Sequence, residues 1–151
     1  MFEIISKSAE ETKTIGKFIG EVLKPNDVLA LFGELGAGKT VLVQGLALGL
    51  GVSDTPASPS FVIANEYTGK IPLFHIDLYR LSEGAEIEEL GLEEYFSKDG
   101  VAVIEWAERG RELLPENSVN IKIEVLDESR RKIKISGGDS DRFKFVLRGL
   151  E

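Results

Sequence analysis

The chain of 151 residues contains no cysteine, which excludes disulfide bonds and thiolate metal sites. It has no run of 18 apolar residues, so we expect neither a membrane-spanning helix nor a membrane partner. Its first residues, MFEIISKSAEE, combine no basic segment with a long apolar core, so we expect no secretory signal. Together these features predict a cytoplasmic protein, and the length suits a single domain spanning residues 1–151.

Positive charge is also scarce. Acidic residues number 26 against 18 lysines and arginines, which gives a formal net charge of −8 at pH 7. Proteins that hold nucleic acid by its phosphates generally carry a basic patch, and the short cluster Arg130-Arg131-Lys132 does not reverse the overall balance. If the function involves RNA, we expect partner subunits to hold that RNA.

Apolar patterning predicts an α/β protein with a mixed sheet. We expect strands over 2–6, 28–32, 61–67, 71–79 and 101–104, and helices over 8–23, 40–51, 85–96 and 107–114. Ser8 followed by Glu11 fits the capping box at a helix start. Polar and apolar residues alternate over 120–127, 130–136 and 142–148, which predicts antiparallel C-terminal strands with one wet face.

Residues 33–40 read GELGAGKT and fit the P-loop pattern G-x-x-x-x-G-K-[ST]. Glycines let successive backbone N–H groups face phosphate oxygens, and the helix that follows directs its positive dipole end at the same anion. Lys39 would reach the β- and γ-phosphates, and the Thr40 hydroxyl would ligate Mg²⁺. We therefore expect nucleotide binding, rather than a structural turn with an exposed lysine, and a P-loop NTPase-like three-layer α/β/α sandwich.

Two carboxylates are candidates for the second half of such a site, because a P-loop enzyme needs an acid at the end of a neighbouring strand. Glu105 ends the apolar strand VAVIE, and Asp77 lies on the alternating strand LFHIDLY. Helix capping by these carboxylates is the alternative. The pattern leaves open whether His75 is structural or chemical.

Other polar and aromatic residues near these acids have open roles. Tyr79 and Arg80 could be structural residues, could sense the phosphate or could bind a partner. Trp106 is either a half-buried aromatic residue or an interface residue. Ser58 and Ser60 belong either to an ordinary turn or to a loop that responds to the γ-phosphate.

The ordered set GELGAGKT, SPSF (58–61), HIDLYR (75–80) and IEW (104–106) closely resembles the bacterial TsaE family over roughly residues 8 to 115. Membership implies a Mg²⁺-dependent ATPase, binding ATP or ADP, that supports threonylcarbamoylation of adenosine 37 in tRNA (t6A). It implies TsaD and TsaB as partner subunits, with tRNA met only through them.

The resemblance also implies roles for individual residues. Lys39 and Asp77 are expected to act in hydrolysis, Thr40 and Glu105 to ligate Mg²⁺, and Ala9 and Arg130 to approach the rest of the nucleotide. The family's loop commonly reads T-S-P-T, whereas here Ala57 lacks the first hydroxyl. The expected nucleotide-binding set is Gly33, Leu35, Gly36, Ala37, Gly38, Lys39, Thr40, Ala9 and Arg130.

Rival functions remain at this point. A P-loop kinase acting on a small molecule or nucleotide would need a basic lid, whereas the segment 82–94 is acidic. A GTPase is disfavoured because the guanine-reading motif N-K-x-D does not occur. A third possibility is a nucleotide-gated assembly module with little hydrolysis.

Overall fold

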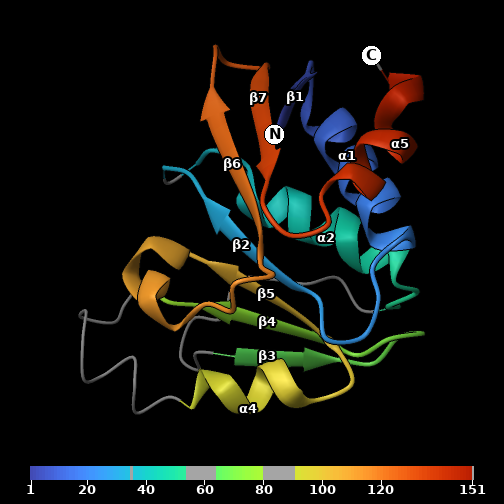
Figure 1. The fold of residues 1–151 in the computed structure, drawn as a ribbon. Helices are drawn as coiled ribbons and strands as arrows, with labels where there is room; N and C mark the ends of the chain where they lie inside the picture. Colours follow the sequence, from blue (N-terminus) through green and yellow to red (C-terminus); the bar gives the residue numbers. More distant parts are fainter. Residues whose placement is uncertain (35, 54–63, 80–90, 151) are drawn as a thin grey trace.

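The computed structural model describes residues 1–34, 36–53, 64–79 and 91–150 (Figure 1). Several predicted features lie outside these ranges, namely Leu35, the loop that contains Ser58 and Ser60, Arg80, and the first part of the acidic segment.

A mixed sheet of seven strands forms the centre of the part of the chain that the structure describes, in the order β1-β7-β6-β2-β5-β4-β3 (Figure 1). Strands β6, β2, β5 and β4 run parallel to their neighbours in that order, and β1, β7 and β3 are antiparallel additions. The bounds are β1 Phe2–Ser6, β2 Val28–Phe32, β3 Ala64–Tyr67, β4 Leu73–Asp77, β5 Val101–Glu105, β6 Val119–Val125 and β7 Arg131–Ser136.

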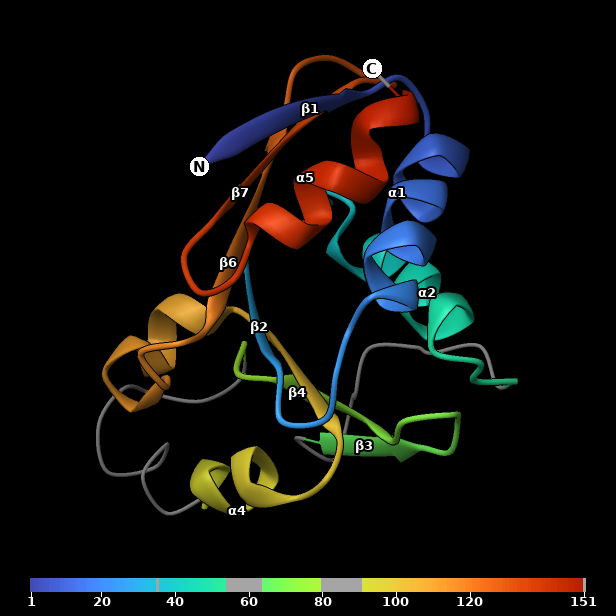
Figure 2. The same ribbon diagram turned by 45° about the vertical axis from the view of Figure 1, so that its right-hand side comes forward.

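Helices cover both faces of this sheet, and the alternation of β2 shows how (Figures 1 and 2). Leu29 and Leu31 belong to the core shared with α1 (Ala9–Glu21), α2 (Lys39–Gly49) and α5 (Asp141–Leu147). Val28, Ala30 and Phe32 face the opposite way, toward α4 (Leu92–Ser97) and the 3-10 helix η1 (Ala107–Leu113). A second 3-10 turn, η2, spans Arg148–Leu150. The predicted three-layer α/β/α class is therefore confirmed.

The predicted start of the first helix at Ser8 is confirmed. Ser8 is the N-cap of α1, and its hydroxyl accepts a hydrogen bond from the backbone N–H of Glu11 at 3.1 Å. Ile15 and Ile19 follow one turn apart and are fully buried against the sheet. Local capping and the spacing of apolar residues are thus sufficient to define this helix.

Helices α1 and α2 approach each other closely at four glycines, Gly16 and Gly20 on α1 and Gly45 and Gly49 on α2. A Cβ atom built on Gly45 would lie 2.1 Å from the carbonyl oxygen of Lys13, and one on Gly49 would lie 2.2 Å from that of Lys17. Neither distance leaves room for a methyl group, so the contact is backbone against backbone. Because α2 begins at the glycine turn, this contact also fixes where the turn lies.

The sequence prediction of a strand over 142–148 is wrong, because residues 142–147 belong to helix α5 and Arg148 begins the 3-10 turn η2. Phe143 and Leu147, four residues apart, are buried against the core, whereas Phe145 between them is 72% exposed. Arg142 adds an ion pair to Asp27 at 2.8 Å. The spacing of Phe143 and Leu147 fits a helix, although polar and apolar residues also alternate in this segment. Packing of these two side chains against the core that includes α1 favours the helix.

Three other segments compare with the sequence prediction as follows. The hairpin β6–β7 confirms two of the antiparallel strands predicted for the tail. The predicted helix over 107–114 is the 3-10 helix η1, with a kink at Gly110. Within the described part of the acidic segment, α4 begins after Gly91, whose φ is 68°.

No helix in the described ranges is both long and apolar enough to cross a membrane.

Candidate functional site

Three parallel strands end side by side and bring the predicted site residues together. In the sheet register Leu31 of β2 is opposite Glu105 of β5, and Glu105 is opposite Asp77 of β4. The glycine turn follows β2 directly, so both carboxylates lie at the same edge as the turn. Ligands of open parallel sheets bind at this carboxyl edge.

The turn between β2 and α2 depends on glycine at its two ends. Gly33 has a φ of 154°, and a Cβ there would lie 2.9 Å from the carbonyl oxygen of Ile123. Gly38 has a φ of 106° and is the N-cap of α2. Other residue types rarely adopt these angles, so the glycines allow the chain to reverse and start a helix whose N–H groups face the bend.

Lys39 is nearly fully buried at the first position of α2. Its Nζ donates a hydrogen bond to the carbonyl oxygen of Gly33 at 2.6 Å and lies 3.5 Å from the ring centroid of Trp106. Burial lowers the pKa of the Lys39 ammonium, while the negative charges of Glu105 and Glu108 oppose that effect. The structure therefore holds a desolvated cation at the turn, where it can act on a phosphate group.

Asp77 lies half-buried at the end of β4. One of its oxygens, Oδ1, accepts the backbone N–H of Tyr79 at 2.9 Å. Burial raises the pKa of the Asp77 carboxyl, and the negative charge of Glu105 raises it further, although the hydrogen bond from Tyr79 opposes the change. A carboxylate with a raised pKa is a better proton acceptor than an exposed one.

Glu105 and His75 form a buried pair, in which the Nε2 of His75 contacts an Oε2 of Glu105. Since a carboxylate only accepts, Nε2 carries the proton of this bond. The other ring nitrogen, Nδ1, has no hydrogen-bond partner within the described structure. The histidine, whose role the sequence left open, therefore lies behind Glu105 and restricts the orientation of its carboxylate.

Two aromatic rings cover one side of the site. Trp106 adopts a left-handed backbone conformation, with a φ of 57°, that few bulky residues accept. Its ring packs on that of Tyr79 with the centroids 4.8 Å apart, and Tyr79 remains 43% exposed. The strained conformation places the Trp106 indole over Lys39, and tolerated strain of this kind is concentrated at functional sites.

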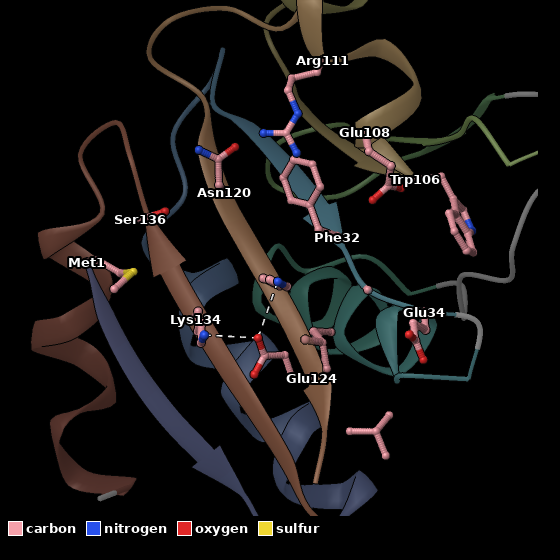
Figure 3. A pocket seen from close by; sticks show the side chains of 14 residues that line it. Met1, Phe32, Glu34, Trp106, Glu108, Arg111, Asn120, Glu124, Lys134 and Ser136 are labelled. Carbon is pink, nitrogen blue, oxygen red and sulfur yellow. Dashed lines mark ion pairs between the residues drawn. The ribbon is translucent and has the colours of Figure 1, made fainter. Parts of the chain in front are cut away.

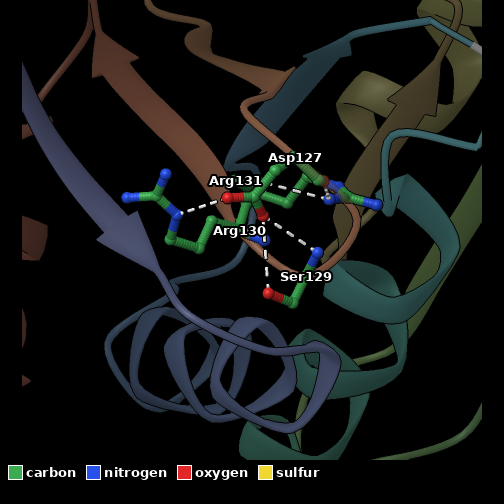
Figure 4. A network of polar contacts seen from close by, with 4 residues as sticks. All are labelled: Asp127, Ser129, Arg130 and Arg131. Carbon is green, nitrogen blue, oxygen red and sulfur yellow. Dashed lines mark hydrogen bonds and ion pairs between the residues drawn. The ribbon is translucent and has the colours of Figure 1, made fainter.

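A small cavity of about 170 Å³ adjoins the other side of the turn. Ala9, which the family resemblance implies to lie near the nucleotide, lines this cavity together with residues of the turn. Arg130 does not line it, because its Nε pairs with Asp127 at 2.7 Å (Figure 4). The lining residues are Ala9, Thr12, Gly36, Ala37, Gly38, Val41, Glu128, Ser129 and Arg131.

Sequence patterns did not single out Arg131, although its guanidinium contacts the turn. Its Nε donates to the carbonyl oxygen of Ala37 at 2.9 Å, across 94 residues of sequence. One signal in the sequence could have separated Arg131 from Arg130, namely that the predicted strand begins here. Neighbouring residues on a strand point to opposite faces, so only one of the two arginines can face the turn.

A larger and more open hollow, of about 980 Å³, lies between η1 and the outer face of β6 and β7 (Figure 3). Its floor is polar, with Glu124 paired to Lys134 at 3.1 Å and to Lys122 at 3.5 Å. It reaches Glu34 of the turn but is not lined by Lys39 or by the two strand-end carboxylates. We therefore assign the candidate chemistry to the strand ends and not to this hollow.

The donor set at the strand ends fits a magnesium ion that is bound mainly by phosphate and water. No group of three or more histidine, cysteine, aspartate and glutamate side chains that could hold a metal occurs among the described residues. Mg²⁺ at phosphate sites commonly takes one or two protein oxygens and retains several waters. Thr40, which follows Lys39 on α2, and Glu105 can supply those oxygens.

Comparisons with known proteins agree with one another. The family model described as "Threonylcarbamoyl adenosine biosynthesis protein TsaE" matches residues 6–133. The tRNA threonylcarbamoyladenosine biosynthesis protein TsaE of Bacillus subtilis (strain 168) is 46% identical over 125 residues, covering 82% of this chain and 78% of that protein. Its counterpart in Treponema pallidum (strain Nichols) is 40% identical over 132 residues, or 87% and 98% of the two chains.

A solved structure also matches along almost the whole chain. The crystal structure of Bacillus subtilis YdiB superposes with a TM-score of 0.80 at 37% sequence identity. The superposition covers 99% of this chain and 93% of that one. The similarity therefore includes the C-terminal region, where the sequence resemblance was weak.

Proposed function

This chain belongs to the TsaE family, and from that premise we propose that it is a Mg²⁺-dependent ATPase subunit required for t6A formation at adenosine 37 of tRNA. We propose that it hydrolyses ATP in complex with partner subunits TsaD and TsaB and thereby supports their turnover. The relatives are named for biosynthesis of this nucleoside, which supports the process but not the chemical step.

The observation that carries the ATPase proposal is the single edge shared by the glycine turn and two carboxylates. Glu105 and Asp77 end two of three adjacent parallel strands, β5 and β4, and Lys39 begins the helix that follows the third, β2. A nucleotide-binding turn alone would account for affinity. The half-buried Asp77, with its raised pKa, supplies what hydrolysis needs in addition, a group that can orient water and accept its proton.

Each residue has a separate role in this proposal. The N–H groups at the start of α2 bind the phosphates, and Lys39 compensates their charge. Thr40 and Glu105 would hold Mg²⁺, which when bound adds positive charge next to the phosphates. His75 keeps Glu105 in orientation, and Trp106 and Tyr79 limit the access of bulk water to Lys39.

The nucleoside would occupy the small cavity beside the turn. Among its lining residues, Ala9, Thr12 and Val41 provide partly apolar surface for a base, and Glu128 and Ser129 provide polar groups. The net charge of −8 supports the further proposal that partners hold the tRNA.

Calorimetric titration with Mg·ADP tests the binding step. The wild-type chain should bind, and Lys39→Ala should lose most of the affinity, whereas Lys132→Ala, on the outer sheet face, should bind normally. Equal affinity in the Lys39 variant would overturn the assignment of the turn.

Reconstitution with TsaB, TsaD and tRNA tests the reaction. ATP turnover and repeated rounds of modification should depend on this chain, and Asp77→Ala should keep ADP binding while slowing turnover. Phosphate transfer to a small-molecule acceptor, with no dependence on the partners, would instead establish the kinase alternative.

A further inference from the structure

The guanidinium of Arg131 connects two parts of the molecule that are distant in sequence. Its Nε donates to the Ala37 carbonyl in the glycine turn at 2.9 Å. Its Nη1 donates to the carbonyl oxygens of Asp127 at 2.8 Å and of Arg130 at 2.9 Å. One planar group thus binds the β6–β7 hairpin and the turn at the same time.

The hairpin end of this connection is well ordered by its own hydrogen bonds (Figure 4). Asp127 accepts from the backbone N–H groups of Ser129 at 3.0 Å and Arg130 at 2.8 Å, and from the Arg130 guanidinium at 2.7 Å. These bonds, led by the one from the Arg130 side chain, lower the pKa of Asp127 to about 2. Asp127 therefore stays ionised even below the ordinary pKa of a carboxyl group, and its hydrogen bonds keep the hairpin closed where Arg131 begins β7.

The turn end of the connection has a geometric consequence for the next peptide group. The carbonyl of Ala37 and the N–H of Gly38 belong to one planar trans peptide and point in opposite directions. Since Arg131 holds the carbonyl on one side, the Gly38 N–H faces the other side. A glycine with a φ of 106° at this position has no side chain that would otherwise restrict the peptide.

We propose that Arg131 is a positioning residue that orients the Ala37–Gly38 peptide so that the Gly38 N–H is presented to a bound phosphate group. The inference rests on the proposed nucleotide binding. Its structural half, the ordering of the turn by Arg131, concerns the free protein. Arg131 acts through the backbone of the turn and not by direct contact with the phosphates.

Two variants and one control separate geometry from charge. Arg131→Ala removes the guanidinium, and Arg131→Lys keeps a positive charge but not the planar fork that serves three carbonyls. Lys132→Ala is the matched control, because Lys132 is the next residue on β7. Within the described part of the chain, its side chain forms a long surface ion pair with Glu3 at 3.9 Å.

The first measurement is binding of ADP and of inorganic pyrophosphate to each variant. Arg131→Ala should weaken the binding of both ligands about tenfold. This is the effect expected when the charge-assisted hydrogen bond from the Gly38 N–H to a phosphate oxygen is lost. Arg131→Lys should be intermediate, and Lys132→Ala should match the wild type. Weakened ADP binding with unchanged pyrophosphate binding would show that Arg131 contacts the nucleoside instead, and would overturn the proposal. So would wild-type affinities in Arg131→Lys.

The second measurement is backbone ¹⁵N relaxation of the free protein, which needs no ligand. In Arg131→Ala the order parameters of Gly36 and Gly38 should fall, while those of β2 stay unchanged as an internal reference for global stability. Unchanged order in the turn would overturn the proposal even if affinity fell. If the wild-type chain binds no ADP but the order parameters of the turn still fall in Arg131→Ala, the proposed function is refuted. The link between the hairpin and the turn is then retained.

Discussion

Replacing Gly45 with alanine tests the contact between α1 and α2 on which the position of the glycine turn depends. The new methyl would lie 2.1 Å from the Lys13 carbonyl oxygen, 2.9 Å from the carbonyl carbon and 3.0 Å from the Cα of Gly16. All three are backbone atoms, so no side chain can rotate away. The helices must separate, and the buried side chains beside them lose contact.

The expected cost follows from two opposing terms. Overpacking of a core typically costs about 1–3 kcal/mol, and a clash with backbone belongs at the upper end, about 3 kcal/mol. Alanine in place of glycine stabilises a helix by about 1 kcal/mol. The free energy of unfolding should therefore fall by about 2 kcal/mol, which for a chain of this size lowers the Tm by about 4–8 °C.

Thermal and urea denaturation, followed by circular dichroism, measure this change. Leu48→Ala is a suitable control, because it places alanine on the same helix at a half-exposed position. The double variant Gly16→Ala/Gly45→Ala should cost less than the sum of the single ones, since one separation of the helices accommodates both methyl groups. A Tm at or above that of the wild type in Gly45→Ala would refute the reasoning, because helix propensity would then outweigh the contact.

Other predictions concern the site and the first helix. Burial raises the pKa of Asp77, so ionisation of this carboxyl group lowers the stability of the fold once the pH exceeds the ordinary carboxyl pKa. Asp77→Asn should therefore raise the Tm at pH 7 but not at pH 3, whereas Asp99→Asn, at an exposed position, should not show this difference. Equal Tm changes in the two variants would contradict this sign. Ser8→Ala should lower stability by about 1 kcal/mol in urea titrations through loss of the cap, and an unchanged midpoint would show that the cap contributes nothing. Adding Mg·ADP should alter Trp106 fluorescence as Lys39 engages phosphate, whereas Lys39→Ala should show no such change. Filter binding at physiological salt should detect no appreciable tRNA binding by the isolated chain; tight binding would refute the assignment of tRNA to the partners.

Features that depend on neighbouring residues could be predicted from the sequence. The apolar strand 28–32, the glycine turn and the helix after it form one continuous segment. Ser8 likewise caps its helix by accepting from the N–H of Glu11, only three residues later. Predicting that Asp77 and Glu105 share an edge needed only the assumption that their strands run parallel. Capping, strand burial and glycine conformations are local, so the order of residues along the chain largely determines them.

Features that depend on distant residues were decided by the tertiary structure. His75 could be structural or chemical until the sheet placed it against Glu105, 30 residues away, and Arg131 gained its role only when the hairpin met Ala37. Helix α5, at 141–147, was likewise decided by packing on α1, since its sequence fits both the helical and the strand period. Strand order and register determine which distant side chains meet, and these follow from burying the whole sheet at once, which no local pattern records.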